Sequence, residues 1–300
     1  MAAHQKIPLM VASGYSSHYD GTMSSLKALI LLALPLFARP LLLALLLALF
    51  MAGITFGPVR AQTALSFDQQ VEVMAMNEEG DFILKSGEIL RPAELMLPKA
   101  GDCERLPKVC TLVKEIQGYH QQHMVGRRVY IDKGSSFHDR YNRLHAHIQS
   151  ADGHWLQHSL FHQGLARVEA TESSPTTTPL LLGIEANARK QEKGIWSLKA
   201  FKPLTPDIPK ARMDRFQIIE GTIHKTAEVR GVIYLNFGDN WREDFTIKLA
   251  KDMRHKFADK GQSLLALKDH PIRIRGWLFW ENGPMISLHN PEQLEILNQE

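Results

Sequence analysis

The segment Asp139-Arg140-Tyr141-Asn142-Arg143 opens the most strongly patterned part of the chain, which closes on Gly194-Ile195-Trp196-Ser197. Residues 142–150 alternate between apolar and polar side chains, as a half-buried strand does. Residues 155–165 carry apolar side chains at helical spacing, and Thr178-Pro179 has the residue types that begin a second helix. This order predicts one strand followed by two helices.

Upstream of this segment, short runs of alternating apolar and polar residues predict strands between residues 71 and 97. Gly80 and Ser86-Gly87 interrupt the runs where tight turns would join neighbouring strands. A helix is expected after Pro107, and residues 127–132 have the pattern of a further strand. Short strands joined by tight turns indicate a small barrel.

The order and spacing of these motifs resemble the staphylococcal-nuclease-like, or thermonuclease (TNase-like, SNase), family. The resemblance covers about residues 71–297 and is strongest over 139–197 and in the C-terminal tail. It implies a mainly β fold with α-helices, namely an OB-like five-stranded barrel with three helices over residues 68–200.

A second module is expected after residues 201–212, where prolines make a linker. The tail resembles a module that follows the nuclease-like domain in some bacterial members of the family. It predicts a second, smaller OB-like β-barrel over residues 213–300, with a helical interruption near 251–258. Its five expected strands are Phe216–Ile223, Val232–Phe237, Phe245–Leu249, Ile272–Phe279 and Met285–Leu288.

Nucleases of this family cut phosphodiesters with Ca²⁺ held by carboxylates, a Glu that acts on water, and two arginines on the phosphate. By resemblance, Arg91 and Arg143 match the two phosphate-binding arginines and Asp81 matches one metal ligand. Met96 stands at the place of a metal-ligand Asp, and Lys99 at that of the catalytic Glu. A thioether is a poor Ca²⁺ ligand and an amine is no replacement for the carboxylate base.

These exchanges leave three hypotheses open. A catalytically degenerate protein would bind nucleic acid, another anionic polymer or an envelope partner, and would need no cofactor. An active phosphodiesterase would need Ca²⁺ and relocated acids such as Glu94, Asp102 or Glu104. The third is a non-enzymatic envelope scaffold. Net charge does not choose among them, because residues 1–61 hold four of the 35 bases and one of the 32 acids, which leaves 31 of each.

The two arginines also have a purely structural alternative, which is pairing with acids such as Asp139, Glu94 or Glu79 inside the barrel mouth. In the tail, Arg273, Arg275 and Trp277 fall on one side of an alternating strand. If that side is exposed, they form a ligand-binding strip like those of OB-fold surfaces. The alternative is that the tryptophans of the tail are structural.

Cys103 and Cys110 are seven residues apart with Pro107 between them. On one helix their Cα atoms would be roughly 10 Å apart, so a disulfide requires a loop or a break there. An exported chain favours the disulfide, and the alternative is two free thiols.

Residues 1–61 predict a leader. Translation is expected to start at Met23. Apolar runs then occupy residues 28–37 and 41–56, and a possible cleavage site lies directly after Ala61. The segment is therefore either a cleaved signal peptide or an uncleaved membrane anchor through residues 41–57. Both readings export residues 62–300 to the periplasm or beyond, with the anchor held in the inner membrane.

Overall fold

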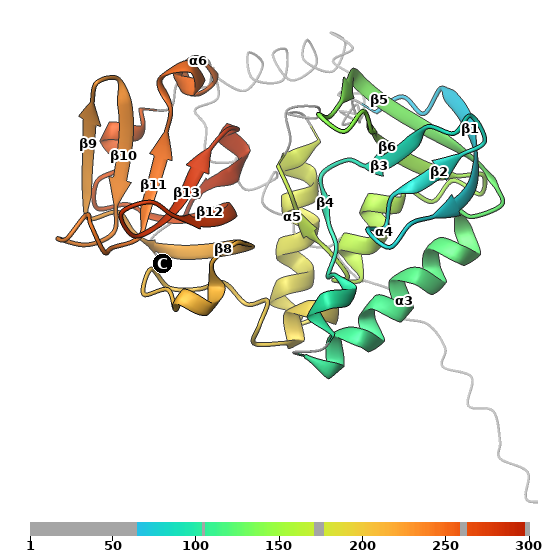
Figure 1. Cartoon of the computed structure of the whole chain (residues 1–300), viewed down its shortest axis with the longest axis horizontal. Helices are drawn as coiled ribbons and strands as arrows, with labels where there is room; N and C mark the ends of the chain where they lie inside the picture. The colour runs from blue at the N-terminus through green and yellow to red at the C-terminus, as the bar shows by residue number, and fades with distance from the viewer. Residues whose placement is uncertain (1–64, 104–105, 171–176, 259–262, 298–300) are drawn as a thin grey trace, which may run out of the picture. The chain divides into compact units, whose positions relative to one another are not determined.

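The structure is a computed structural model that describes residues 65–103, 106–170, 177–258 and 263–297. Thr63–Glu300 forms one compact unit, and all the elements below belong to it (Figure 1). The predicted signal peptide or membrane anchor lies outside the described residues. Within the described part of the chain, no helix has both the length and the apolar character that crossing a membrane requires.

Five strands close into the predicted barrel in the order β1-β2-β3-β6-β5. Their bounds are β1 Gln69–Met76, β2 Phe82–Leu84, β3 Ile89–Pro92, β5 Arg128–His138 and β6 Leu144–Ser150. Gly87 makes the turn between β2 and β3 with a φ of 87°, a conformation that favours a residue without Cβ. β3 and β6 run parallel, with Leu90 opposite Leu144. This pairing places Arg91 near the start of β6, where Arg143 lies.

The three predicted helices of this barrel are confirmed. They are α3 Pro107–His123, α4 Leu156–His162 and α5 Thr178–Lys190. Leu156, Leu160 and Phe161 of α4 are fully buried, as the helical spacing predicted, and Ile116 of α3 joins the same core. A small sheet of β4 Leu95–Met96 and β7 Arg167–Val168 was not predicted, because two residues are too few to show an alternation.

The tail forms a seven-stranded sheet that contains all five predicted strands and two more. The strands are β8 Arg215–Thr222, β9 Lys225–Val229, β10 Val232–Asn236, β11 Thr246–Leu249, β12 Pro271–Trp280, β13 Pro284–Leu288 and β14 Leu294–Ile296. The short helix α6, Arg254–Ala258, lies in the predicted helical interruption. Figure 1 shows these elements at the orange and red end of the chain.

The strand order of the tail repeats that of the first barrel when β8 and β9 are taken as two halves of one bent strand. β8 pairs with β12 and β9 pairs with β10, and the order continues from β10 through β11 and β13 to β12. At the bend, Ile223 N donates to His270 O and His224 N donates to Asn236 O. β11 and β13 are the parallel pair, as β3 and β6 are in the first barrel. The tail thus repeats the strand order of the first barrel within a seven-stranded sheet.

An apolar cluster joins the first barrel and its helices to the tail. Its buried residues are Met96, Val109, Ala188, Ile195, Trp196, Phe201, Phe216 and Ile218. These residues come from β4, α3, α5, the segment after α5 and β8. Because one core continues from the first barrel into the tail, side chains of both contribute to shared clefts.

Candidate functional site

Asp81 is the carboxylate that Arg91 and Arg143 share. Arg91 Nη1 lies 3.3 Å from Asp81 Oδ1, and Arg143 Nη1 lies 3.1 Å from Asp81 Oδ2. The carboxylate is held in place because Asp81 N donates to Asn77 Oδ1, and the residue is only 2% exposed. Each oxygen of Asp81 is therefore already bonded to a guanidinium.

Asp139 orients Arg143 from the turn that precedes β6. Arg143 Nε lies 2.7 Å and Nη2 lies 2.6 Å from Asp139 Oδ2, while the backbone N–H groups of Tyr141 and Arg143 donate to Asp139 Oδ1. Burial raises the pKa of Asp139, but the hydrogen bonds from Arg143, His145 and Tyr141 outweigh it and hold this pKa well below its usual range. Pairing of Arg143 with Asp139 was one of the structural alternatives, and it is confirmed.

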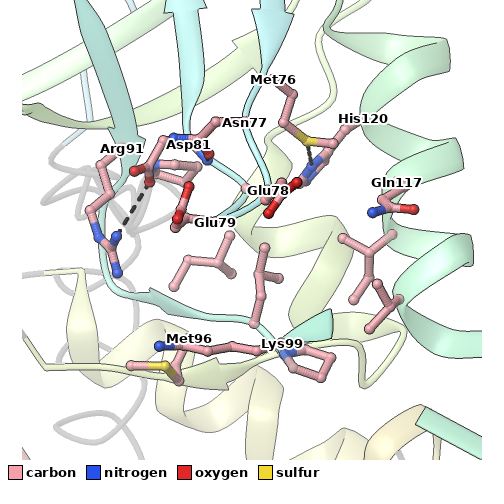
Figure 2. A pocket seen from close by; sticks show the side chains of 17 residues that line it. Met76, Asn77, Glu78, Glu79, Asp81, Arg91, Met96, Lys99, Gln117 and His120 are labelled. Atoms are coloured by element: carbon pink, nitrogen blue, oxygen red, sulfur yellow. Dashed lines mark hydrogen bonds and ion pairs between the residues drawn. The ribbon is translucent and has the colours of Figure 1, made fainter. Parts of the chain in front are cut away.

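A cleft opens beside Arg91 and is drawn in Figure 2. Met96 and Lys99 lie across it from Asp81 in this view. Met96 is buried in β4, whereas Lys99 is exposed, with its Nζ 5.5 Å from the ring centre of Trp277 in β12. His120 of α3 also lines the cleft, and burial lowers its pKa to about 4.

Residues 107–198 match the family described as Staphylococcal nuclease homologue. This part of the chain is a staphylococcal-nuclease-like domain. The match contains β5, β6 and the helices α3 to α5, and the closed barrel adds β1 to β3 from upstream. No curated protein matches the chain.

Glu94 and Asp102, two of the acids expected to relocate in an active phosphodiesterase, accept hydrogen bonds from groups other than Arg91 and Arg143. Glu94 is buried and accepts hydrogen bonds from Thr177 and Thr178. Asp102 accepts from the backbone N–H of Lys99. The expectation that Glu94 pairs with the two arginines is wrong, since its carboxylate is taken by the hydroxyls. Glu104 lies outside the described residues.

Ca²⁺ does not fit the residues present at this mouth. The ion takes about six to eight oxygen ligands and favours several carboxylates. Asp81 offers two oxygens, and guanidiniums already neutralise both. Within the described residues, no group of three or more His, Cys, Asp or Glu side chains is placed to hold a metal ion. The donor set therefore differs from the one that the family resemblance implies.

Tyr141 is a candidate binding residue that the sequence reasoning missed. Its ring is 62% exposed, and the guanidinium carbons of Arg140 and Arg143 lie 4.9 and 5.1 Å from its centre. Asn142 turns the chain here with a φ of 59°, which Asn tolerates better than most residues. The sequence signal for such a site is an aromatic residue between two arginines, Arg140 and Arg143.

The strip predicted in the tail is only partly exposed. Arg275 is 1% exposed, because its guanidinium is bonded to Glu185 of α5 at 2.9 Å and to Glu295 of β14 at 2.7 Å. The prediction of an outer face is therefore wrong for Arg275. Two carboxylates neutralise the buried charge, which makes its burial tolerable.

The other two members of the strip also contact acids. Arg273 pairs with Glu220 at 2.6 Å and is half-buried. Trp277 is 46% exposed, and its Nε1 donates to Glu169 of the nuclease-like domain. The alternation that grouped these residues on one side of β12 was right, but part of that side packs against the nuclease-like domain.

Cys103 and Cys110 are free thiols in the structure, so the predicted disulfide is not formed. A hydrogen bond with Cys110 raises the pKa of the Cys103 thiol to about 11, and burial contributes less. Cys110 lies in the first turn of α3, beyond the break at Pro107 that a contact between the two residues requires. The two thiols are therefore close enough to form a hydrogen bond, and no disulfide bond links their sulfur atoms.

Proposed function

We propose that the protein binds nucleic acid through its nuclease-like domain without hydrolysing it. The observation that carries the proposal is the double pairing of Asp81 with Arg91 and Arg143. A carboxylate whose two oxygens are both bonded to guanidiniums attracts a cation weakly, because its negative charge is already neutralised. The proposed protein needs no metal cofactor.

The position matched to the catalytic Glu supports the same conclusion. Lys99 carries a cation there, and its amine lies over Trp277. A lysine ammonium has no lone pair with which to take a proton from water. Hydrolysis thus lacks both the ion and the base at the places where the family has them.

Binding is supported by the surface around Tyr141. Its exposed ring offers a stacking face for an unpaired base, and Arg140 beside it is exposed and has no ion pair with a described residue. Arg91 bonds Asp81 through Nη1 alone, which leaves further N–H groups to donate to a phosphate. Cations beside an exposed aromatic ring are the usual means of holding single strands.

The place of this activity in the cell is part of the proposal. The apolar leader at residues 28–37 and 41–56 supports export, and the nucleic acid would then be met in the periplasm or outside the cell.

The test is a combined binding and cleavage assay on the purified chain. Labelled single- and double-stranded DNA and RNA are incubated with Ca²⁺, with Mg²⁺ or with a chelator, and both anisotropy and product length are followed. We expect binding that weakens with salt, at a slope of about 0.7 per phosphate contacted on a single strand, and intact substrate in every condition.

Two variants and one control locate the binding surface. Arg140→Gln and Tyr141→Ala should each weaken binding of single strands by about 3- to 10-fold, because each removes one phosphate or stacking contact. Arg128→Gln removes an exposed arginine of β5 and should leave binding unchanged. Metal-dependent shortening of the substrate that Arg143→Ala abolishes would overturn the proposal.

A further inference from the structure

Arg167 of β7 is a partly buried cation that packs against two aromatic rings. Its guanidinium carbon lies 5.2 Å from the ring centre of Phe201 and 5.0 Å from that of Phe216, and Nη1 donates to Phe216 O at 2.7 Å. Nε is buried and has no hydrogen-bond partner, and no described carboxylate lies within ion-pair distance of the side chain. Burial lowers the pKa of Arg167 to about 10, which reflects the cost of this charge. Such cations normally have an anion beside them.

Arg167 lines a cleft between the nuclease-like domain and the tail, with a volume of ≈ 270 Å³. Lys99, Arg212 and Arg215 also line it, whereas Asp102 and Asp214 are its carboxylates. Cations therefore outnumber acids by four to two. Arg215 Nη1 lies 3.6 Å from Asp102 Oδ1, which makes a long ion pair. Arg212 donates to the backbone carbonyl of Ala200 and has no ion pair with a described residue.

Lys99 connects this cleft with the one beside Arg91. It lines both clefts, together with Met96 and Leu97. Its amine has no carboxylate partner among the described residues and lies over Trp277, which lines the cleft of Arg167. Lys99 is thus a cation common to both clefts, while Glu78, Glu79 and Asp81 line the first cleft together with Arg91.

We infer that one single strand of nucleic acid runs from the mouth at Arg91, past Lys99, into a second phosphate site formed by Arg167 and Arg215. This rests on the proposed function and adds to it, because it gives the tail a part of the binding site and names a single strand as the ligand. A phosphodiester entering the second cleft supplies Arg167 with a direct ion-pair partner, which no described carboxylate does. The lysine at the former catalytic position then acts as a phosphate contact.

The probe is a fluorescently labelled oligo(dT) of about 12 nucleotides, within the range of about 4 to 16 that one OB fold covers. Binding to the full chain is measured by anisotropy across a salt series, and a titration at high concentration gives the number of strands per chain. We expect one strand per chain, because a single strand occupies both clefts.

Three substitutions test the second cleft with opposite expected signs. Lys99→Gln and Arg215→Gln should each weaken binding about 3- to 10-fold and lower the salt slope by about 0.7. Asp102→Asn removes a carboxylate from the cleft and should tighten binding about 2- to 5-fold. A gain of affinity cannot arise from misfolding. Lys190→Gln, at an exposed position of α5, is the control and should change neither quantity.

The outcomes separate this inference from the proposed function. If the wild type binds and Tyr141→Ala weakens it, but the substitutions at Lys99, Arg215 and Asp102 change nothing, the second site is refuted and the proposed function stands. Two strands per chain would refute the continuous path. No binding of oligo(dT) by the wild type would overturn both.

Discussion

Replacing Asp81 with Asn tests the central arrangement of the barrel mouth. The change keeps the shape of the side chain but removes the charge that Arg91 and Arg143 share at 3.3 and 3.1 Å. At an effective dielectric constant of about 20, each pair has a Coulomb energy of about 5 kcal/mol before desolvation is subtracted. Loss of one partner of a buried pair costs about 3–5 kcal/mol.

The expected net cost is lower here, about 2–3 kcal/mol, because the two arginine side chains keep some contact with water and Arg143 keeps Asp139. For a unit of this size, that loss should lower the melting temperature by about 5–10 °C. At the same time, the released guanidiniums should bind oligo(dT) about 5- to 10-fold more tightly. Stability and affinity are thus expected to change in opposite directions.

Thermal unfolding followed by circular dichroism measures the first effect, and anisotropy at about 0.1 M salt measures the second. Asp68→Asn is the matched control, because Asp68 is exposed on the same domain and has no ion pair with a described residue. If Asp81→Asn has the same melting temperature as the wild type, the two ion pairs do not stabilise the barrel as argued. If it binds more weakly, Asp81 does not compete with phosphate.

Three further predictions concern other residues. The pKa of His120 is lowered from 6.5 to about 4 in the folded state, so on acidification the unfolded state binds a proton first. The free energy of unfolding should therefore fall by about 1.4 kcal/mol per pH unit between pH 6.5 and pH 4. Urea unfolding at several pH values should show a smaller fall for His120→Gln. Arg275→Ala leaves Glu185 buried without its main counter-ion and should cost about 3–5 kcal/mol in the same assay, whereas Arg275→Lys should recover part of it. A hydrogen bond with Cys110 raises the pKa of Cys103 to about 11, so Cys103 should react slowly with iodoacetamide near pH 8. Cys110→Ala should make that reaction faster. Equal rates in the wild type and the variant would count against the hydrogen bond.

The sequence predicted the regular elements well because their signals are local. The alternation before Gly87 and the helical spacing of Leu156 and Leu160 each lie within a few residues of one another. Both signals appear in the structure as expected. The two-stranded sheet of β4 and β7 gave no such signal, because its strands of two residues are too short to show a period. The same holds for the three residues of β14.

The candidate site was predicted less completely than the fold. By resemblance, the sequence predicts that Met96 and Lys99 stand where the family has acids, and this prediction needs only their order along the chain. It did not identify Asp81 as the shared partner of the arginines. Asp81 and Arg143 are 62 residues apart, and only the closure of the barrel brings them together.

The amino-acid sequence by itself therefore determined most of the longer strands and the main helices. Only the tertiary structure decided which charges meet, that Arg275 is buried against Glu185 90 residues away, and that Lys99 lies over Trp277. The physical reason is range. Secondary structure follows from hydrogen bonds and side-chain spacing between near neighbours, whereas an ion pair depends on distances of 3 to 4 Å between segments that the chain order leaves unspecified.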